Sequence, residues 1–408
     1  MSLVVQKYGG SSVADSQKIL NVAKRIIETK KKGNKVVVVV SAMGDTTDEL
    51  LKLASEITDS PPERELDMLL STGEQVSIAL LSMAIKELGE QVISFTAPQA
   101  GIFTDQKHTK AKILNINADK IKRELDRDKI VIVAGFQGVT EDYEITTLGR
   151  GGSDTTAVAL AAALEANLCE IYTDVDGVYT ADPRLVKEAK KLSLISYDEM
   201  LELASLGAKV LHPRAVECAK NNGVPLVVRS TFNDNAGTLL KEVVNMERIR
   251  PVSGIAHDIN VAKITLYDVP DRPGVAAEIF KALAKEGINV DIIVQSANRA
   301  EFNDISFTVS HDELNKALKI VNEVAKKLGS KRVEYNSRVA KVSIVGAGMI
   351  SNPGVAATMF SALAEAGINI IMISTSEIRI SCIIEEDKVE EAVKVLHRTF
   401  ELDKVEQF

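Results

Sequence analysis

The sequence PGVAAEIFKALAKEGINV, residues 273–290, returns eighty residues later as PGVAATMFSALAEAGINI, residues 353–370. In each copy a Pro-Gly turn leads into an amphipathic segment, and a glycine, Gly287 or Gly367, stands where a helix C-cap belongs. A short apolar strand pattern follows each glycine. The period is too long for a solenoid and there are only two copies, so the pattern predicts a duplicated module.

Each copy continues with the same order of elements. The second strand and second helix of the two copies are expected at residues 303–309 and 312–327, and at residues 377–384 and 387–400. The order β-α-β-β-α, closed by a further strand, is typical of ferredoxin-like α+β modules. We therefore predict module 1 over residues 256–335 and module 2 over residues 336–408. Residues 402–408 are a candidate for a last strand that returns to module 1.

The N-terminal part of the chain has a different pattern, in which apolar strand segments alternate with amphipathic helices. Strands are expected at residues 3–5, 35–40, 130–134, 170–172 and 224–228. Several of them are unbroken β-branched runs, which is typical of strands buried on both faces by helices. The alternation predicts an α/β domain over residues 1–235, with a mostly parallel sheet sandwiched by helices. Residues 236–255 are the expected linker to the modules.

Length, charge and cysteine usage narrow the class of protein. A chain of 408 residues is expected to form two or three domains. Its formal net charge of −8 argues against a nucleic-acid partner. Because Cys169, Cys218, Cys382 and the five histidines are scattered, we expect neither disulfides nor a metal site. No apolar run approaches the ~20 residues of a membrane span, and no basic-then-apolar leader opens the chain, so we expect a cytoplasmic protein without membrane contact.

In a parallel α/β sheet, ligands bind where strands end and loops lead into helices. The first such loop, residues 7–12, contains Lys7, Gly9 and Gly10 directly after a strand. Adjacent glycines let backbone N–H groups approach a phosphate, and a helix N-terminus favours anions. The alternative is a plain turn with a solvated lysine. A second loop, residues 41–44 (SAMG), also consists of small residues, but such loops are common.

A third loop, residues 149–156 (GRGGSDTT), leads into an alanine-rich helix. Its glycines around Arg150 predict an anion site in which the guanidinium can bind a carboxylate through two hydrogen bonds. Asp154 has an ordinary alternative, which is helix N-capping. Capping, however, explains neither the glycines nor the arginine.

The fourth loop, residues 173–184 (TDVDGVYTADPR), is richer in acidic residues. It lacks the remaining ligands of a calcium loop, so a nucleotide loop fits better, with a simple turn-rich connection as the alternative. Two further residues are ambiguous on their own. Glu74 lies in STGEQ, a capping-box pattern for which helix capping is the simplest interpretation. Lys209 cannot be told from a surface lysine.

Together these segments resemble the aspartokinase family, within the amino-acid kinase fold. The motifs that carry the resemblance are KYGGSS (7–12), SAMG (41–44), STGEQ (71–75), GRGGSDTTA (149–157), TDVDGVYTADPR (173–184) and the paired C-terminal copies. The copies look like two ACT modules, which bind small effectors. The resemblance runs from Lys7 to about Phe400, and it is to the monofunctional form without a fused homoserine dehydrogenase.

The resemblance implies transfer of the γ-phosphoryl group of ATP to the side-chain carboxylate of L-aspartate. The product is 4-phospho-L-aspartate, and the reaction is the first step of the lysine, threonine and methionine pathway. An aspartate carboxylate with a pKa near ~3.9 is already ionised, so no general base is needed. The chemistry is instead charge neutralisation and alignment. Mg²⁺ is expected to enter with ATP rather than in a protein site.

The family also implies roles for individual residues. Lys7 and Asp154 are the expected catalytic pair, in which Lys7 neutralises the phosphoryl group and Asp154 organises the site. The expected substrate residues are Ser41, Thr47, Glu74, Arg150, Gly151, Gly152 and Ser153, with Arg150 on the α-carboxylate and Glu74 facing the α-ammonium. The expected ATP residues are Lys7, Gly9, Gly10, Thr173, Asp174, Tyr179, Asp182, Arg184 and Lys209.

The ACT pair implies feedback control by lysine, threonine or both. The expected effector residues are Asp271, Gly274, Val275, Gln295, Asn352, Asn369 and Ile370. Because ACT modules commonly pair across subunits, a homodimer or homotetramer is expected. Met246 is a candidate start for a shorter product that carries only the modules.

Two rival interpretations stay open at this point. In the first, the fold is the same but the acceptor is acetylglutamate, glutamate or a nucleotide. In the second, the chain is an amino-acid-sensing protein whose kinase half is inactive. The second is disfavoured because the residues expected in an active kinase site, Lys7, Arg150 and Asp154, are present.

Overall fold

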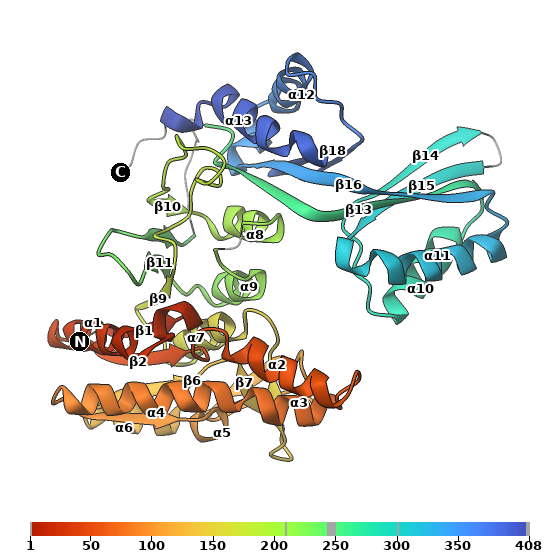
Figure 1. Ribbon diagram of the computed structural model, residues 1–408. Coiled ribbons are helices and arrows are strands. Elements are labelled where there is room, and N and C mark those ends of the chain that lie inside the picture. Colours follow the sequence, from red (N-terminus) through yellow and green to blue (C-terminus); the bar gives the residue numbers. More distant parts are fainter. Residues whose placement is uncertain (1, 209, 243–249, 300–301, 405–408) are drawn as a thin grey trace.

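The computed structural model describes residues 2–208, 210–242, 250–299 and 302–404. An N-terminal α/β domain lies at one end, and a C-terminal pair of modules is built on a separate sheet (Figure 1). This architecture agrees with the predicted fold class.

The N-terminal domain is built on an eight-stranded sheet of order β10-β12-β11-β9-β1-β2-β6-β3. Its strands are β1 (Leu3–Tyr8), β2 (Lys35–Val40), β3 (Val92–Phe95), β6 (Ile130–Ala134), β9 (Leu168–Thr173), β10 (Leu194–Ile195), β11 (Leu226–Ser230) and β12 (Thr238–Leu240). All neighbouring strands pair parallel except β11 and β12, which are antiparallel. The valine run of β2 is buried along nearly its whole length, because helices cover both faces of the sheet.

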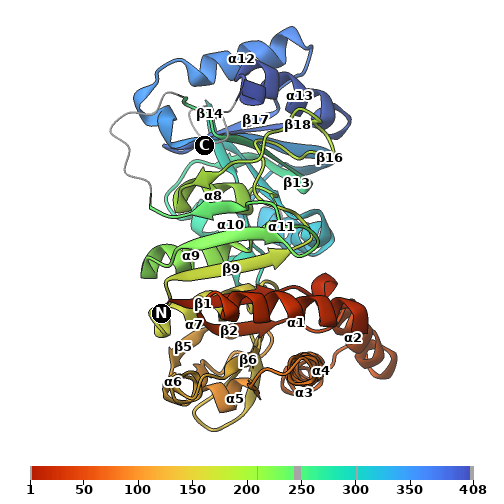
Figure 2. The same ribbon diagram turned by 90° about the vertical axis from the view of Figure 1, so that its left-hand side faces the viewer.

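Helices form a layer on each face, as Figure 2 shows. Helices α1 (Ser16–Lys31) and α4 (Thr72–Glu87) cover one face. The other face is covered by α5 (Ala97–Ala100), α6 (Asp119–Asp126), α7 (Gly152–Ala163), α8 (Tyr197–Ser205) and α9 (Pro213–Asn222). The remaining helices are α2 (Thr46–Ile57), α3 (Glu63–Leu70) and the short 3₁₀ helix η1 (Gly10–Val13).

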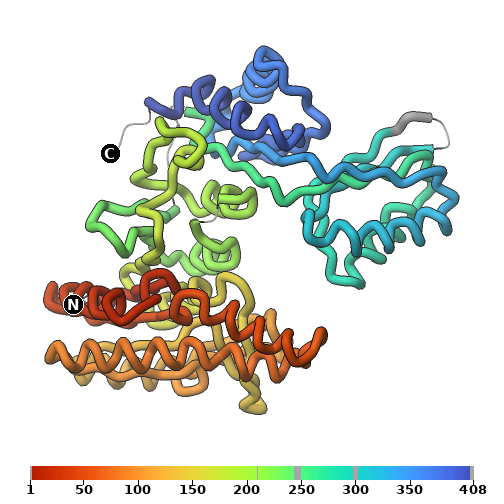
Figure 3. Tube along the Cα trace, viewed as in Figure 1, coloured from red at the N-terminus to blue at the C-terminus, as the bar shows by residue number. Residues whose placement is uncertain are grey.

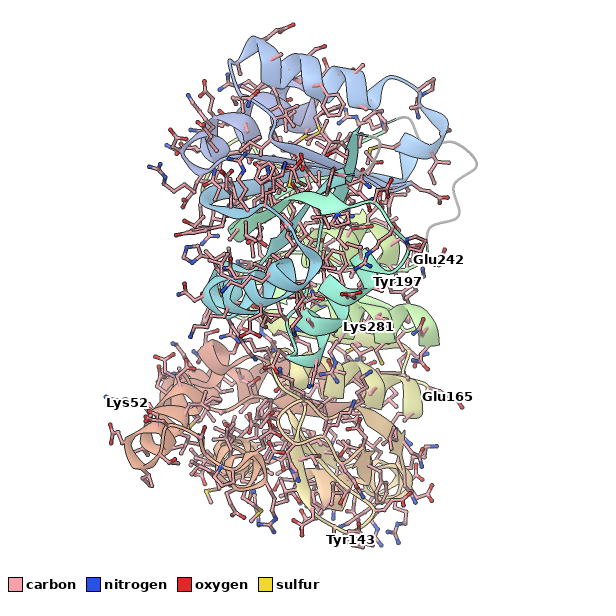
Figure 4. The ribbon with its side chains drawn as sticks, turned by 90° about the vertical axis from the view of Figure 1, so that its right-hand side faces the viewer. Lys52, Tyr143, Glu165, Tyr197, Glu242 and Lys281 are labelled. Carbon is pink, nitrogen blue, oxygen red and sulfur yellow. The ribbon has the colours of Figure 1, made fainter. Side chains whose placement is uncertain are left out.

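A small second sheet of order β5-β4-β7-β8 lies beside α3. It consists of β4 (Ile102–Thr104), β5 (Ile113–Ile116), β7 (Gln137–Val139) and β8 (Ile145–Thr147). The sequence did not predict it, because strands of three or four residues show too little periodicity to be recognised. In Figure 4, Lys52 and Tyr143 lie on the outer surface of this half of the domain.

The C-terminal modules share one six-stranded sheet of order β14-β15-β13-β16-β18-β17. Its strands are β13 (Gly254–Pro270), β14 (Ile293–Arg299), β15 (Phe302–Val309), β16 (Arg332–Val345), β17 (Met372–Thr375) and β18 (Arg379–Glu385). Helices α10 (Val275–Lys285) and α11 (Leu314–Leu328) cover module 1, and α12 (Val355–Glu365) and α13 (Val389–Thr399) cover module 2. Short 3₁₀ helices are η2 (His311–Glu313), η3 (Ala347–Ser351), η4 (Glu386–Lys388) and η5 (Leu402–Lys404).

The long strands β13 and β16 run through both modules, as the trace in Figure 3 shows. The first residues of β13 pair with the end of β16, from Gly254 opposite Val345 to Asp258 opposite Lys341. Later residues of β13 pair with β15 of module 1. The closing strand of module 2 is therefore the beginning of β13.

Three of the expected limits differ from the structure. Strand β12 and the start of β13 fall inside the segment 236–255 that was expected to be a linker, so the N-terminal sheet extends beyond residue 235. The expected last strand is wrong where the chain is described, because Leu402–Lys404 forms η5 and Leu402 is buried in the core of module 2. Residues 405–408, as well as Met246, lie outside the described residues.

One helical stretch among the described residues, Glu63–Glu87, is long and apolar enough to cross a membrane by length and composition, with a mean hydropathy of 1.4. Half (50%) of the 18-residue window that meets this test is buried inside the protein, where α4 packs on α1 and the sheet. The core helix of a soluble protein passes the same test, so the stretch is weak evidence of a span.

Candidate active site

The carboxyl ends of β1, β2 and β9 bring three of the glycine-rich or acidic loops to one edge of the sheet. The N–H of Gly9 donates to the carbonyl of Tyr172 at 3.2 Å, and the N–H of Ser41 donates to the carbonyl of Tyr8 at 3.1 Å. The loops after these strands therefore begin side by side. This is the edge at which ligands bind in parallel α/β sheets.

The central contact at this edge is an ion pair between Lys7 and Asp154. Lys7 Nζ lies 2.7 Å from Asp154 Oδ1, and the two side chains are only 11% and 14% exposed. A lysine held in this way is not the solvated side chain of a plain turn. Asp154 does not cap its helix either, because the N-cap of α7 is Gly151 and no side chain bonds there. The loops of Lys7 and Asp154 thus converge as the sequence predicted.

The two glycines after Lys7 serve different purposes. A Cβ on Gly10 would lie 2.9 Å from the carbonyl oxygens of both Ala42 and Gly44, so this position has room only for glycine. Gly9 leaves open the space next to Lys7 Nζ, which is 3.5 Å from where a Cβ would stand. The N–H of Gly9 already donates to the carbonyl of Tyr172. The N–H of Gly10 is therefore the better candidate to donate to a phosphate.

The loop that carries Arg150 is shaped by close contacts at its glycines. Gly151 has a φ of +70°, and its missing Cβ would lie 2.1 Å from the ring of His212. Gly152 is pressed against Phe136 in a similar way, with 2.9 Å to the position of a Cβ. Arg150 itself is exposed at the tip of this loop. The side chain is therefore accessible to a ligand while its backbone is held in place.

Glu74 is the residue whose surroundings differ most from the expectation. It is 2% exposed, and its Oε1 accepts from the N–H of Ala42 at 3.1 Å. The N-cap of α4 is Ser71 without a side-chain hydrogen bond, so the capping-box interpretation is wrong. Its second oxygen, Oε2, is buried and finds no hydrogen-bond partner among the described residues. Burial raises the pKa of Glu74 to about 8, although hydrogen bonds from backbone N–H groups oppose this.

The other residues expected around the substrate lie near the same loops. Ser41 directly follows β2 and is half-buried, and Thr47 lies in the first turn of α2. Ser153 is buried in the first turn of α7, where its Oγ lies 2.7 Å from the position of a Cβ on Gly135. Gly135 directly follows β6, so a fourth strand end contributes to this edge.

The acidic loop begins at the same edge and then leaves it. The hydroxyl of Thr173 donates to the carboxylate of Asp174 at 2.9 Å, directly after β9. The hydroxyl of Tyr179 donates to Asp176 at 2.7 Å, and burial together with this bond raises the pKa of Tyr179 to about 12. Asp176 also binds Lys191 and thereby fixes the loop.

The remaining expected ATP residues lie farther along. Asp182 and Arg184 pair with each other through bonds of 2.7–3.2 Å, and the arginine side chain is 85% exposed. The same segment is anchored on module 2, since Thr180 Oγ1 lies 3.0 Å from His397 Nε2. Lys209 lies outside the described residues.

Module 1 contains a separate cavity of about 220 Å³ between the end of β13 and the strands β14 and β15. Four of the expected effector residues line it, namely Asp271, Gly274, Val275 and Gln295. The other three, Asn352, Asn369 and Ile370, flank α12 in module 2. The structure therefore brings four of the seven together.

The sequence reasoning missed Asn303, which also lines this cavity. Asn303 is 4% exposed, and its Oδ1 has no hydrogen-bond partner among the described residues. A buried amide on a strand is the signal that could have been noticed, because such groups normally need a partner. Ala42 was also missed. It contributes only backbone atoms, so its residue type gives no indication of this contact.

Comparison with known proteins identifies the class. Residues 2–230 match the amino acid kinase family, and residues 268–324 and 342–400 match the ACT domain. The fold and the site therefore define an ATP-dependent kinase of the amino acid kinase family that carries ACT domains.

More specific relatives cover the whole chain. It is 56% identical over 402 residues to an aspartokinase of Bacillus sp. (strain MGA3), with 98% of both chains covered. It is 54% identical over 404 residues to aspartokinase 2 of Bacillus subtilis (strain 168), with 99% of each covered. The crystal structure of E. coli aspartokinase III in complex with aspartate and ADP (R-state) has a TM-score of 0.81 at 27% identity, covering 97% of this chain and 99% of that chain. The chain belongs to the aspartokinase family.

Proposed function

We propose that this chain transfers the γ-phosphoryl group of ATP to the side-chain carboxylate of L-aspartate and forms 4-phospho-L-aspartate. This would be the first step of the pathway to lysine, threonine and methionine. The observation that carries the proposal is the 2.7 Å pair of Lys7 and Asp154 at an edge shared with Arg150 and Glu74. The relatives named aspartokinase and the E. coli structure with aspartate and ADP support it.

The phosphoryl transfer needs charge neutralisation more than proton transfer. The attacking carboxylate is already ionised, with a pKa near ~3.9 in water. It must approach a polyanionic phosphate, so cationic and N–H donors lower the barrier. Lys7 Nζ stabilises the charge on the transferred group, and the N–H of Gly10 adds a second donor. Asp154 holds the ammonium of Lys7 in position, because the two groups already form an ion pair.

The substrate is held at its α-carbon by two opposite charges. Arg150 binds the α-carboxylate with two parallel hydrogen bonds, for which its exposed position leaves room. Glu74 binds the α-ammonium through Oε2, the oxygen that accepts no hydrogen bond from the described residues. Binding a cation there favours the ionised carboxylate, so aspartate lowers the pKa of Glu74 and releases a proton. The walls of the pocket are completed by Ser41, Thr47, Gly151, Gly152 and Ser153.

The nucleotide lies along the acidic loop. Residues that hold it are Thr173, Asp174, Tyr179, Asp182, Arg184 and Lys209, together with Lys7, Gly9 and Gly10. Among the described residues, no group of three or more His, Cys, Asp or Glu side chains is arranged for a metal ion. We therefore propose that Mg²⁺ enters with the phosphates of ATP and neutralises part of their charge.

Regulation is proposed to start in the module 1 cavity. Its 220 Å³ suit an amino acid, and Oδ1 of Asn303, which has no hydrogen-bond partner within the described part of the chain, can accept from an ammonium or hydroxyl group. Lysine, threonine or both are the proposed inhibitors, and a structure of E. coli aspartokinase III holds lysine and aspartate. Asn352, Asn369 and Ile370 of module 2 would complete the effector site at an interface between modules. The chain is proposed to form a homodimer or homotetramer through these modules. We place the enzyme in the cytoplasm.

Release of ADP tests the proposed reaction. Purified enzyme with MgATP should release ADP only when aspartate is present, and hydroxylamine should trap an acyl phosphate in equal amount. Glutamate, acetylglutamate and a nucleoside monophosphate are the comparison acceptors. Release that is faster with any of these than with aspartate would contradict the proposal. Repeating the assay with lysine and threonine tests the regulation.

A further inference from the structure

Asp67 on α3 is a buried carboxylate to which the proposed reaction gives no role. Its side chain is 0% exposed. An ionised carboxylate buried so completely is costly unless hydrogen bonds satisfy both oxygens. Here they do. Thr147 Oγ1 donates to Oδ1 at 2.6 Å, the N–H of Thr109 reaches both oxygens at 3.1 Å, and His108 Nδ1 lies 2.8 Å from Oδ2.

The donors belong to the segment that supports the Arg150 loop. Thr147 is the last residue of β8, three positions before Arg150. Thr109 packs against the same loop, because its carbonyl oxygen lies 2.9 Å from the position of a Cβ on Gly149, whose φ is +75°. The carboxylate of Asp67 therefore fixes the two backbone segments, around Thr109 and around Thr147, that hold the Arg150 loop.

Arg214 on α9 fixes the same two segments from the other side. Its guanidinium donates to the carbonyl of Leu148 at 2.5 Å and to the carbonyl of Ala111 at 2.9 Å. The N–H of Ala111 in turn donates to the carbonyl of Thr147 at 2.9 Å. The Arg150 loop is thus held between two charged side chains, of which Asp67 is the fully buried one.

Asp67 is also connected to the other end of the substrate pocket. The N–H of Ser71 donates to the carbonyl of Asp67 at 3.0 Å, so α3 continues almost directly into α4. Gln137 locks this junction by donating to the carbonyl of Ser71 at 3.0 Å. Glu74 follows Asp67 by seven residues, which places the two carboxylates on the same face of the helical stretch.

We propose that Asp67 is a positioning residue that sets the separation between Arg150 and Glu74. This inference rests on the proposed function, in which those residues hold the α-carboxylate and α-ammonium of aspartate. With both groups fixed, the side-chain carboxylate of a four-carbon diacid reaches the phosphoryl group, and one more methylene misplaces it. Asp67 thereby contributes to aspartate affinity and to discrimination against glutamate.

The test is Asp67→Asn, which keeps the shape of the side chain. It replaces one acceptor oxygen with an NH₂ group, which cannot accept the hydrogen bonds that are donated to the carboxylate. We expect the KM for aspartate to rise about tenfold or more, with the KM for ATP within about twofold of the parent. We also expect the ratio of aspartate to glutamate activity to fall. Glu65→Gln is the matched control, because Glu65 lies on the same helix, is exposed, and pairs with exposed Arg64 at 2.6 Å.

Two further measurements keep the outcome decisive. Thr147→Val removes one donor with little change in shape and should shift the KM for aspartate in the same direction, even if Asp67→Asn fails to fold. Amide hydrogen exchange of residues 148–152 should become faster in Asp67→Asn without any substrate, a readout that does not depend on the reaction. A folded Asp67→Asn enzyme with an unchanged KM for aspartate and unchanged exchange overturns the inference. Absence of aspartate-dependent ADP release in the parent overturns the proposed function instead.

Discussion

The catalytic edge and the module 1 cavity are both built where a glycine turn leads into a helix, yet they differ in how deeply their charged side chains are buried. At the catalytic edge, Lys7 and Asp154 form an ion pair at 2.7 Å between largely buried side chains. In module 1, the charged residues that line the cavity, Asp271 and Arg272, are exposed, and its buried polar side chain is the amide of Asn303. Each site also contains a buried oxygen to which the described residues donate no hydrogen bond, Glu74 Oε2 or Asn303 Oδ1.

The difference shows what each task requires. A site that transfers a phosphoryl group must hold its charges in place, since they act best when they need not reorganise. A sensing site needs only a modest difference in affinity between two states, typically ~1–3 kcal/mol, which one or two hydrogen bonds supply. Substitutions at the catalytic edge should therefore have large effects, and substitutions in the cavity small ones.

The largest effect is expected for Lys7→Ala. Loss of one electrostatic donor to the transition state typically lowers turnover by ~10²–10³-fold. The fold should survive, as judged by thermal unfolding, although Asp154 loses its partner. Lys24→Ala, an exposed residue of α1, is the control. Turnover close to the parent's would remove the proposed role of Lys7.

Arg150→Ala should act on substrate binding rather than turnover. A charge-assisted hydrogen bond contributes ~1.5–3 kcal/mol, which corresponds to a KM for aspartate raised about 10- to 150-fold. The KM for ATP should stay the same. The control is Arg123→Ala, on the exposed side of α6. An aspartate saturation curve that matches the parent's would exclude the α-carboxylate contact.

Glu74 should make aspartate affinity depend on pH. Its pKa in the free enzyme is about 8, so the carboxyl is mostly protonated at pH 7 and must ionise to bind an ammonium. Affinity should therefore increase with pH, up to about tenfold per unit, and level off above pH 8. Glu74→Gln should flatten this profile, whereas Glu87→Gln at the exposed end of α4 should not. A parent profile that is flat from pH 6 to 8 would contradict the assignment.

The smallest effect is expected in module 1. Asn303→Leu removes a buried oxygen that has no partner among the described residues, so the free enzyme should be as stable as the parent or slightly more so. Inhibition by lysine or threonine should weaken about 2- to 12-fold, the value of one neutral hydrogen bond of ~0.5–1.5 kcal/mol. Asn322→Leu, on the exposed face of α11, serves as control. Unchanged inhibition would show that Asn303 does not contact the effector.

The sequence predicted the parts of the structure that have strong local patterns. Buried valine runs marked β2 and its neighbours, and the repeated PGVAA segments marked α10 and α12. The resemblance implied that Lys7 and Asp154 act together, and the structure places them 2.7 Å apart, although the Asp154 loop follows the antiparallel strand β8 rather than a parallel one. Strands of three residues, such as β12, were missed because they are too short to show alternation.

The side chains that were misjudged or missed are those whose partners are distant in sequence. Glu74 fits a capping box, but its carboxylate bonds to Ala42, 32 residues away. Asp67 bonds to Thr147, 80 residues away, and no local pattern reports such a contact. The sequence nevertheless contains a pattern that indicates buried acids at Asp67 and Glu74. Asp67, Leu70, Glu74 and Leu81 follow the helical spacing of a buried face, and acids on such a face require partners.

The central claim is that the loops of Lys7 and Asp154 form one pocket for a nucleotide and an amino acid. A crystal structure of this chain with a non-hydrolysable ATP analogue, Mg²⁺ and aspartate tests it most directly. We predict the γ-phosphate within hydrogen-bond distance of Lys7 Nζ, and the aspartate between Arg150 and Glu74. A nucleotide bound away from Lys7, or aspartate bound elsewhere, would contradict the account.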